Sequence, residues 1–179
     1  MPKDLPKPED DGACSHLQGL QLPSLSLAAT SGSCVDVLAG PGLTILFCYP
    51  RTGAPGEVVP DSWNAIPGAR GCTPQACSFR DNVPQLKSLG VDHLYGLSTQ
   101  STEYQQEVHD RLHLPYGLLS DEALKFRNAL DLPTFDWEGK KVIRRLTLAI
   151  EGGKIIKCFY PVFPSDNITP VIEWLKSRQ

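Results

Sequence analysis

The chain has 179 residues, enough for one domain of ordinary size with its own hydrophobic core. Apolar residues make up 41% and charged residues 21% of the sequence, as in water-soluble globular proteins. The net charge of −3 comes without a basic cluster, which argues against a nucleic-acid partner, and no stretch reaches the ~20 apolar residues of a membrane helix.

The chain opens with MPKDLPKPEDDG, a charged and proline-rich segment without the apolar run of a secretory signal. We expect residues 1–19 to be a disordered lead and residues 20–179 to form a single domain. A cytoplasmic location is expected, since the acidic start does not resemble a transit peptide either. The six cysteines are expected to be reduced thiols, because the chain is large, poor in cysteine and without an export signal.

The first predicted elements are a β-hairpin and an interior strand. Short apolar stretches on both sides of Thr30-Ser31-Gly32-Ser33 predict the hairpin over residues 22–38. The apolar, β-prone run Leu43–Tyr49 predicts a strand buried on both faces of a sheet. Residues 51–71 are rich in Pro and Gly and predict a long loop, and loops of this length are usually functional or disordered.

A helix is predicted after this loop, ending at Gly90. Thr73 is a natural N-cap and Pro74 a natural first helical residue, and apolar residues then recur at helical spacing. The later predicted elements are a strand at 93–98, a helix at 102–112, a strand segment at 118–119, a helix at 121–130, a hairpin of strands 142–150 and 154–160, and a closing amphipathic helix at 168–177. Strands that alternate with helices indicate an α/β fold with a mixed sheet.

Cys72 lies where the long loop meets the predicted helix. Free backbone N–H groups and the helix dipole at a helix N-terminus favour a nearby anion. They therefore favour the thiolate over the thiol, and the thiolate is the nucleophilic form of cysteine. We interpret Cys72 as a reactive thiol; the alternative is a small apolar residue that fills space at this position.

Cys77 follows five residues later on the same predicted helix. This spacing places the two Cα atoms about 8.6 Å apart, whereas a disulfide needs at most ~7 Å. The two cysteines could therefore bridge only if the first turns of the helix unwound. Taken alone, Cys77 fits a buried helix residue equally well.

The segment Gly71–Asp81, GCTPQACSFRD, resembles the signature of the peroxiredoxin Q subfamily, also called bacterioferritin comigratory proteins. Three further segments agree in their order along the chain: Phe47–Pro50, Leu114–Asp121 and Arg145–Ile150. The resemblance covers about residues 22–175. It implies a thioredoxin-like fold, in which a central mixed sheet is flanked by helices and preceded by an N-terminal β-hairpin extension.

The resemblance also implies roles for particular residues. Cys72 matches the peroxidatic cysteine, Cys77 the resolving cysteine, and Arg145 the arginine that stabilises the thiolate and polarises the O–O bond. Its neighbour Arg144 should point to the opposite face of a strand.

The implied activity is that of an atypical 2-Cys peroxiredoxin, which closes an intrachain disulfide during its cycle. The substrates would be hydrogen peroxide and organic hydroperoxides, and the reductant thioredoxin, glutaredoxin or a low-molecular-weight thiol. No cofactor, metal, nucleic acid or membrane is expected to take part, and the chain is expected to be a monomer or a weak homodimer.

The family's loop motif, Pro-x-x-x-Thr/Ser-x-x-Cys, is altered in this chain. Pro50 matches the proline, but a long insertion precedes Cys72, and Ala69 stands three residues before the cysteine, where a hydroxyl is expected. That hydroxyl hydrogen-bonds the peroxide and the thiolate. Thr52 is the candidate to supply it, if the insertion loops away from the site.

Other side-chain groups are weaker candidates. His109 and His113 are four apart on a predicted helix, but no third metal ligand is near them in the sequence, so we interpret them as surface residues. The four remaining cysteines lack Cys-x-x-Cys spacing, which argues against a structural zinc and against a disulfide reductase. Cys48 and Cys158 lie in apolar strands and are expected to be buried and inert.

Two classes of function remain open at this point. The first is a thiol peroxidase. The second is a non-enzymatic redox sensor or binding protein on the same fold, in which the altered loop has cost the chain its peroxidase turnover. Consumption of hydroperoxide by the reduced protein with a thiol reductant would distinguish them.

Overall fold

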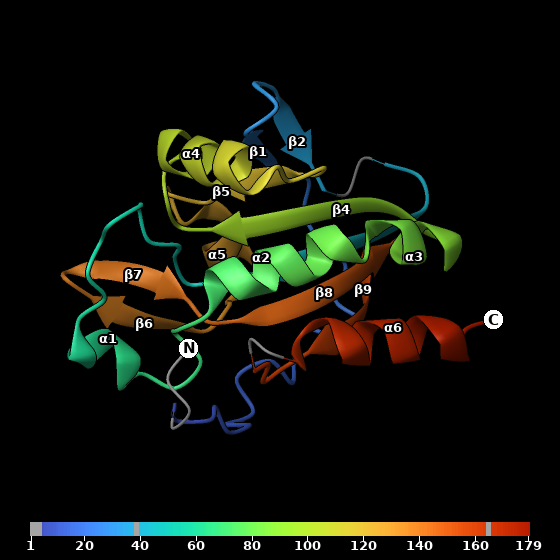
Figure 1. The fold of residues 1–179 in the computed structure, drawn as a ribbon. Helices are drawn as coiled ribbons and strands as arrows, with labels where there is room; N and C mark the ends of the chain where they lie inside the picture. The colour runs from blue at the N-terminus through green and yellow to red at the C-terminus, as the bar shows by residue number, and fades with distance from the viewer. Residues whose placement is uncertain (1–4, 38–39, 164–165) are drawn as a thin grey trace.

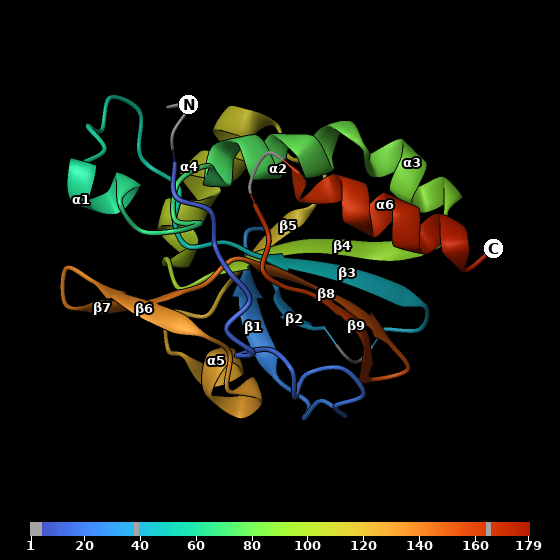
Figure 2. The ribbon, with the colours of Figure 1, turned by 90° about the horizontal axis from the view of Figure 1, so that it is seen from below.

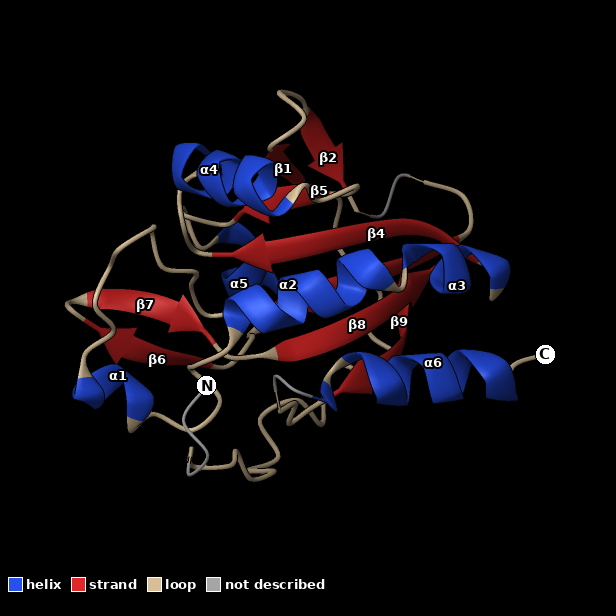
Figure 3. Ribbon diagram, in the orientation of Figure 1, coloured by secondary structure: helices blue, strands red, loops and turns tan. Residues whose placement is uncertain are grey.

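The computed structural model describes residues 5–37, 40–163 and 166–179. Its main feature is a seven-stranded mixed sheet in the order β2-β1-β5-β4-β3-β8-β9, beside a separate two-stranded sheet, β6-β7 (Figures 1 and 3). The strands are β1 (Ser26–Ala29), β2 (Cys34–Asp36), β3 (Leu43–Cys48), β4 (Val91–Ser98), β5 (Gly117–Ser120), β6 (Thr134–Trp137), β7 (Lys140–Ile143), β8 (Leu146–Glu151) and β9 (Lys154–Phe159). The helices are α1 (Asp61–Asn64), α2 (Cys72–Asp81), α3 (Val83–Ser88), α4 (Thr102–Leu112), α5 (Lys125–Leu130) and α6 (Ile168–Ser177).

β3 is an interior strand of the sheet, because every one of its residues is apolar or β-branched and all are buried. It pairs in parallel with β4 and antiparallel with β8. Packing over this region is close: a Cβ atom at Gly96 in β4 would lie 2.7 Å from atoms of both Leu118 and Phe47. The expected α/β class with a central mixed sheet is confirmed.

Helices cover both faces of the sheet (Figure 2). α2, α3, α4 and α6 cover one face, over a core cluster that contains Phe47, Phe79 and Leu118. α5 and the N-terminal segment cover the other face, over a second cluster that contains Leu17 and Phe126. Each face of the central strands therefore has its own apolar layer. None of the helices in the described ranges is long and apolar enough to cross a membrane.

The N-terminal segment differs from the disordered lead expected from its composition. Residues 1–4 lie outside the described residues. Further along, Cys14 and Leu17 are 7% and 0% exposed and belong to the core, and the Gly19 N–H donates to the Ile155 carbonyl at 2.7 Å. Burial of these apolar side chains offsets the entropy lost when the chain is ordered. The core therefore draws on residues before position 20.

The start of α2 also differs from expectation. The helix begins at Cys72 with Gly71 as its N-cap, so Thr73 and Pro74 are the second and third helical residues. The reason is the backbone of Gly71, whose φ of 103° is a left-handed conformation that glycine adopts readily. This turn starts the helix one residue earlier than the Thr-Pro pair suggests.

Two further elements are interrupted where one continuous element was expected. The single predicted helix breaks at Asn82, because Pro84 lacks the N–H and fits only the first turn of a new helix, α3. The predicted strand over residues 142–150 breaks at Arg144 and Arg145, between β7 and β8. β7 pairs instead with β6, in a hairpin that the sequence pattern did not reveal.

The hairpin predicted over residues 22–38 is formed by β1 and β2, with residue 38 outside the described residues. The helix predicted from residue 121 begins only at Lys125. Asp121 stays outside it because its carboxylate accepts the N–H groups of Phe126 at 2.9 Å and Arg127 at 2.8 Å, which requires the carboxylate to lie before the helix.

Candidate active site

Cys72 is the first residue of α2 and is only 4% exposed. Its thiol donates to the Ala69 carbonyl at 3.6 Å, across the tight turn that Gly71 completes. The helix begins directly after this turn, so the sulfur lies beside N–H groups that have no partner within the helix. The predicted position of Cys72 at a helix N-terminus is confirmed.

Arg145 lies against this turn and is 3% exposed. Its Nη2 donates to Cys72 Sγ at 3.2 Å. The same guanidinium donates to the carbonyls of Gly68 at 3.1 Å, Ala69 at 3.3 Å and Arg70 at 3.4 Å. The planar fork of five N–H donors suits this task, since one side chain holds three carbonyls and a sulfur at once. The side chain predicted to lie beside the thiol therefore does so.

Arg144 points elsewhere, although neither arginine lies in a strand. Its Nη1 donates to the Asp11 carboxylate at 3.1 Å and to the Tyr160 hydroxyl at 3.4 Å. Its Nε donates to the Thr134 carbonyl at 3.4 Å. The two neighbours thus serve different regions, with Arg145 directed to Cys72 and Arg144 to the N-terminal segment.

A buried glutamine behind Arg145 was missed by the sequence analysis. Gln75 is 0% exposed, accepts a hydrogen bond from Arg145 Nη1 through Oε1, and donates from Nε2 to Asn167 Oδ1 at 2.9 Å. Asn167 Oδ1 also accepts from the Thr147 hydroxyl at 3.4 Å. The sequence offered one signal for this residue: Gln75 is a polar side chain directly before the apolar Ala76, and both are buried in α2.

Cys77 lies on the intact part of α2 and is half-buried. All six cysteines of the chain lie in the described residues and are free thiols. With both cysteines on one helix, their Cα atoms are about 8.6 Å apart, beyond the span of a disulfide. Cys77 is therefore close to Cys72 in the sequence, but the intact helix keeps the two residues too far apart to form a disulfide.

A pocket of about 360 Å³ opens in front of Cys72. Its wall includes Glu57 and Trp63 from the 51–71 loop and Arg111 from α4. The space in front of Cys72 is thus lined by both charged and aromatic groups. This volume lies within the range of small-molecule sites.

Thr52 lines the same pocket and is 2% exposed. Its hydroxyl donates to Gln100 Oε1 at 3.1 Å, and Gln100 Nε2 donates back to the Thr52 carbonyl at 3.1 Å. The hydroxyl hydrogen is engaged, so the oxygen offers only lone pairs to a ligand. At Ala69, where the family motif has a hydroxyl, the backbone carbonyl instead accepts from Cys72 and Arg145.

The 51–71 loop is folded against the β6-β7 hairpin. It contains the short helix α1, whose Trp63 is 5% exposed and packs against Phe135, Trp137 and Val142. The ring centroids of Trp63 and Trp137 are 4.9 Å apart in an edge-to-face arrangement. The inserted loop is therefore an ordered wall of the pocket.

Glu57 fastens the outer part of this loop. Its carboxylate accepts the Ala54 N–H at 2.8 Å and the Tyr104 hydroxyl at 3.1 Å, and it also forms an ion pair with Arg51. The Ala54 hydrogen bond and the charge of Arg51 hold the pKa of Glu57 below its usual value. The carboxylate is thus ionised at neutral pH and links the loop to α4.

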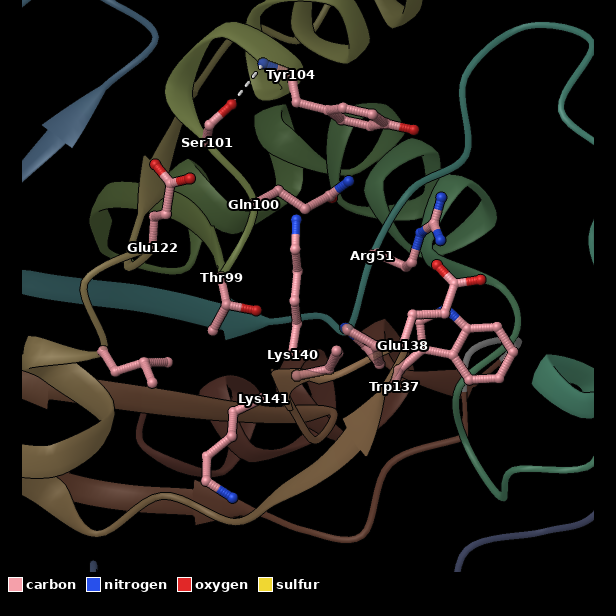
Figure 4. Close-up of a pocket in the computed structure, with 13 residues that line it drawn as sticks. Arg51, Thr99, Gln100, Ser101, Tyr104, Glu122, Trp137, Glu138, Lys140 and Lys141 are labelled. Atoms are coloured by element: carbon pink, nitrogen blue, oxygen red, sulfur yellow. Dashed lines mark hydrogen bonds between the residues drawn. The ribbon is translucent and has the colours of Figure 1, made fainter.

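A second pocket, larger than the one in front of Cys72, does not contain this cysteine. It measures about 590 Å³ and lies beside the active-site loop, with charged groups in its wall that include Arg51, Glu122, Lys140 and Lys141 (Figure 4). Pocket size alone would therefore favour this second pocket over the one in front of Cys72.

The two histidines considered as metal ligands, His109 and His113, lie at the C-terminal end of α4. In the part of the chain that the structure describes, no group of three His, Cys, Asp or Glu side chains is placed to hold a metal ion. His109 Nδ1 instead lies 3.1 Å from the Asp110 carboxylate on the surface of α4, and His113 ends that helix with a φ of 50°. Cys48 is buried as expected, whereas Cys158 is only half-buried.

Comparison with known proteins identifies the family. The Redoxin family profile matches residues 17–172. Peroxiredoxin Bcp of Escherichia coli strain K12 is 30% identical over 161 residues, which cover 87% of this chain and 93% of that protein. Peroxiredoxin bcp1 of Schizosaccharomyces pombe is 33% identical over 125 residues, and the match covers 67% of this chain and 55% of that longer protein.

Solved structures agree with this fold. Peroxidoxin BcpB from Mycobacterium tuberculosis superimposes with a TM-score of 0.72 at 21% identity, covering 92% of this chain and 99% of that one. Peroxiredoxin Q from Xanthomonas campestris gives a TM-score of 0.69 at 20% identity, covering 87% and 96%. The thioredoxin-like fold implied by the resemblance is confirmed. The chain therefore belongs to the peroxiredoxins of the Q and Bcp type within the Redoxin family, and is a thiol-dependent peroxidase.

Proposed function

We propose that the protein reduces hydroperoxides with Cys72 as the attacking nucleophile. The observation that carries this proposal is the contact of Arg145 Nη2 with Cys72 Sγ at 3.2 Å, at the first residue of α2. A guanidinium and a helix N-terminus both stabilise a negative charge on sulfur. The thiolate is the form that attacks an O–O bond.

In the proposed reaction, the Cys72 thiolate attacks one oxygen of the hydroperoxide. The O–O bond breaks, Cys72 becomes a sulfenic acid, and the other oxygen leaves as water or an alcohol after taking up a proton. Arg145 stabilises the thiolate and the charge that develops on the leaving oxygen. Thr52 accepts the hydrogen of the incoming hydroperoxide through the lone pairs that its bond to Gln100 leaves open.

The substrates proposed are hydrogen peroxide and organic hydroperoxides. The pocket of about 360 Å³ is large enough to admit more than hydrogen peroxide, and Trp63 gives its wall an apolar surface for an alkyl group. The similarity to peroxiredoxins supports a peroxide substrate, and thioredoxin, glutaredoxin or a low-molecular-weight thiol is the proposed reductant.

Cys77 is the proposed resolving residue. After the first turns of α2 unwind, its thiol attacks the Cys72 sulfenic acid, forms an intrachain disulfide and releases water. Opening of a terminal helical turn is among the low-cost local motions of a domain. The half-buried position of Cys77 leaves it able to move without disrupting the core.

Replacement of the nucleophile tests the first step. Cys72→Ser should abolish hydroperoxide consumption, because a serine hydroxyl is a far weaker nucleophile at neutral pH. The matched control is Cys34→Ser, at an exposed cysteine in β2, which should keep the wild-type rate. Turnover by Cys72→Ser at the wild-type rate, in a thiol-coupled peroxidase assay, would show that another group attacks the peroxide.

Replacement of Cys77 tests the second step. In Cys77→Ser the first attack should remain fast, while recycling through the intrachain route stops and Cys72 accumulates as sulfinic acid. Peptide mass mapping of the wild-type protein after one equivalent of peroxide should find the Cys72–Cys77 disulfide. A bond from Cys72 to another cysteine of the chain, or to a second chain, would remove the resolving role from Cys77.

A further inference from the structure

A second pair of cysteines lies on the opposite face of the sheet from Cys72. Cys14, in the N-terminal segment, belongs to the core cluster of that face, and Cys158, in β9, packs against the same cluster. The chain on either side of Cys14 is bonded to β9 and to Tyr160, which follows β9, so Cys14 lies beside the strand that carries Cys158. In agreement with this, each thiol shifts the pKa of the other. Cys158 pairs in register with Leu148 of β8, another member of the cluster. The peroxidase chemistry proposed for α2 uses neither of them.

The backbone fixes Cys14 in this position from both sides. Before it, the Asp11 carboxylate accepts from the Tyr160 hydroxyl at 2.9 Å. After it, the Gly19 N–H donates to the Ile155 carbonyl at 2.7 Å, and the Ile155 N–H donates to the Leu20 carbonyl at 3.0 Å. Because β9 and Tyr160 hold the chain on both sides of Cys14, the backbone keeps Cys14 beside β9.

The two thiols differ in access to small molecules. Cys158 is half-buried and lies in the wall of a surface pocket of about 420 Å³, whereas Cys14 is only 7% exposed and does not line that pocket. The hydrogen bond from Cys14 and the charge of Lys157 lower the pKa of Cys158, and the same hydrogen bond raises the pKa of Cys14. Cys158 is therefore the thiol that ionises and meets an oxidant first.

We propose that Cys14 and Cys158 form a second redox pair, which closes an intrachain disulfide on exposure to hydroperoxide and fastens the N-terminal segment to β9. The Cys158 thiolate attacks the hydroperoxide, the O–O bond breaks, and an alcohol or water leaves after taking a proton. Cys14 then attacks the Cys158 sulfenic acid, forms the S–S bond, and a second molecule of water leaves. The two thiols lose two electrons and two protons in total, and the hydroperoxide takes them up.

This disulfide would close a loop of nearly the whole chain. A cross-link of this length removes much of the freedom of the unfolded state and stabilises the folded state. It would also hold in place the segment before Cys14, where Asp11 binds Arg144 beside the active-site arginine. The expected measurable effect is a rise in the thermal midpoint of roughly 5 °C or more.

The test uses the full chain with Cys72→Ser and Cys77→Ser, so its outcome does not depend on the proposed nucleophile. After treatment with hydrogen peroxide, mass mapping without reductant should find one peptide pair joined through Cys14 and Cys158, lighter by two hydrogens than the free peptides. The thermal midpoint should rise and should fall back when dithiothreitol is added. Addition of Cys14→Ser should abolish both changes, while addition of Cys34→Ser as the matched control should abolish neither.

Two results would overturn the proposal. The first is alkylation of Cys14 by iodoacetamide after peroxide treatment, with Cys158 either still a thiol or oxidised to sulfinic acid. The second is a disulfide from Cys158 to any other cysteine. If Cys14→Ser itself unfolds the chain, Cys158→Ser serves in its place, because its half-buried side chain tolerates the hydroxyl more readily.

Discussion

The end of β3 and the start of α2 each carry a buried cysteine in opposite surroundings. Cys48 is 0% exposed within an apolar cluster, where burial raises the pKa of its thiol well above the ordinary value. Cys72 is nearly as buried, at 4%, yet it contacts the guanidinium of Arg145. Two thiols of similar burial therefore lie in different electrostatic surroundings, and under the proposed function only Cys72 reacts. In that proposal the groups that face the sulfur decide its reactivity, since a cation and unpaired N–H groups at the helix start replace the water that burial removes.

Removal of Arg145 should make the surroundings of Cys72 more like those of Cys48. Loss of a charge-assisted contact costs about 1.5–3 kcal/mol, which corresponds to roughly a ten- to hundredfold lower rate if the contact is made in the transition state. Arg145→Ala should therefore slow the second-order reaction with peroxide by this factor, measured by stopped flow. Arg144→Ala is the matched control and should change the rate little, because its partners are Asp11 and Tyr160. The reverse ranking would mean that Arg144 is the group that serves the thiol.

Replacement of Gln75 should produce a smaller effect, because it touches Arg145 and not the sulfur. Gln75→Leu removes one acceptor of the guanidinium, while Nη2 keeps its contacts with Cys72 and the Ala69 carbonyl. If the hydrogen bond that orients Arg145 contributes about 1 kcal/mol to the transition state, its loss should lower the rate of reaction with peroxide about fivefold.

A rescue distinguishes positioning from loss of packing at this residue. Gln75→Glu restores the acceptor for Arg145 and should restore most of the rate. Asn167 can flip its amide to face the new carboxylate, since its Nδ2 has no partner among the described residues. Equal losses in Gln75→Leu and Gln75→Glu would show that Gln75 acts by packing alone.

The sequence could predict the parts of the site that depend on local signals, but not those that depend on contacts between distant residues. A cysteine before a run of helical periodicity indicates a helix N-terminus, because that signal is local. The resemblance to a family placed Arg145 beside the thiol, across a separation of 73 residues that no periodicity spans. Gln75 escaped notice because a single glutamine in a helix is an ordinary surface residue unless the tertiary contacts are known.

The boundaries that were wrong share a physical origin. The left-handed backbone of Gly71 and the proline after Val83 moved helix ends by local geometry. The break at residues 144 and 145 arises because Arg144 and Arg145 turn to partners that are distant in sequence. The burial of Leu17 likewise depends on a surface supplied by the far end of the chain. Composition near one residue carries no information about such partners.

A smaller difference between the surroundings of Cys48 and Cys72 is the hydroxyl of Thr52, which lines the same pocket as Cys72. Thr52→Val keeps the shape of the side chain and removes the oxygen that would accept the hydrogen of the peroxide. A neutral hydrogen bond contributes about 0.5–1.5 kcal/mol, so the reaction with peroxide should slow by roughly two- to tenfold. Gln100 keeps its bonds to the Thr52 backbone, so the loop should stay in place and the thermal midpoint should change little.

Thr52→Ser retains the hydroxyl and is the matched control, expected near the wild-type rate. A wild-type rate in Thr52→Val would leave the Ala69 carbonyl, which already faces Cys72 and Arg145, as the group that replaces the missing hydroxyl of the loop.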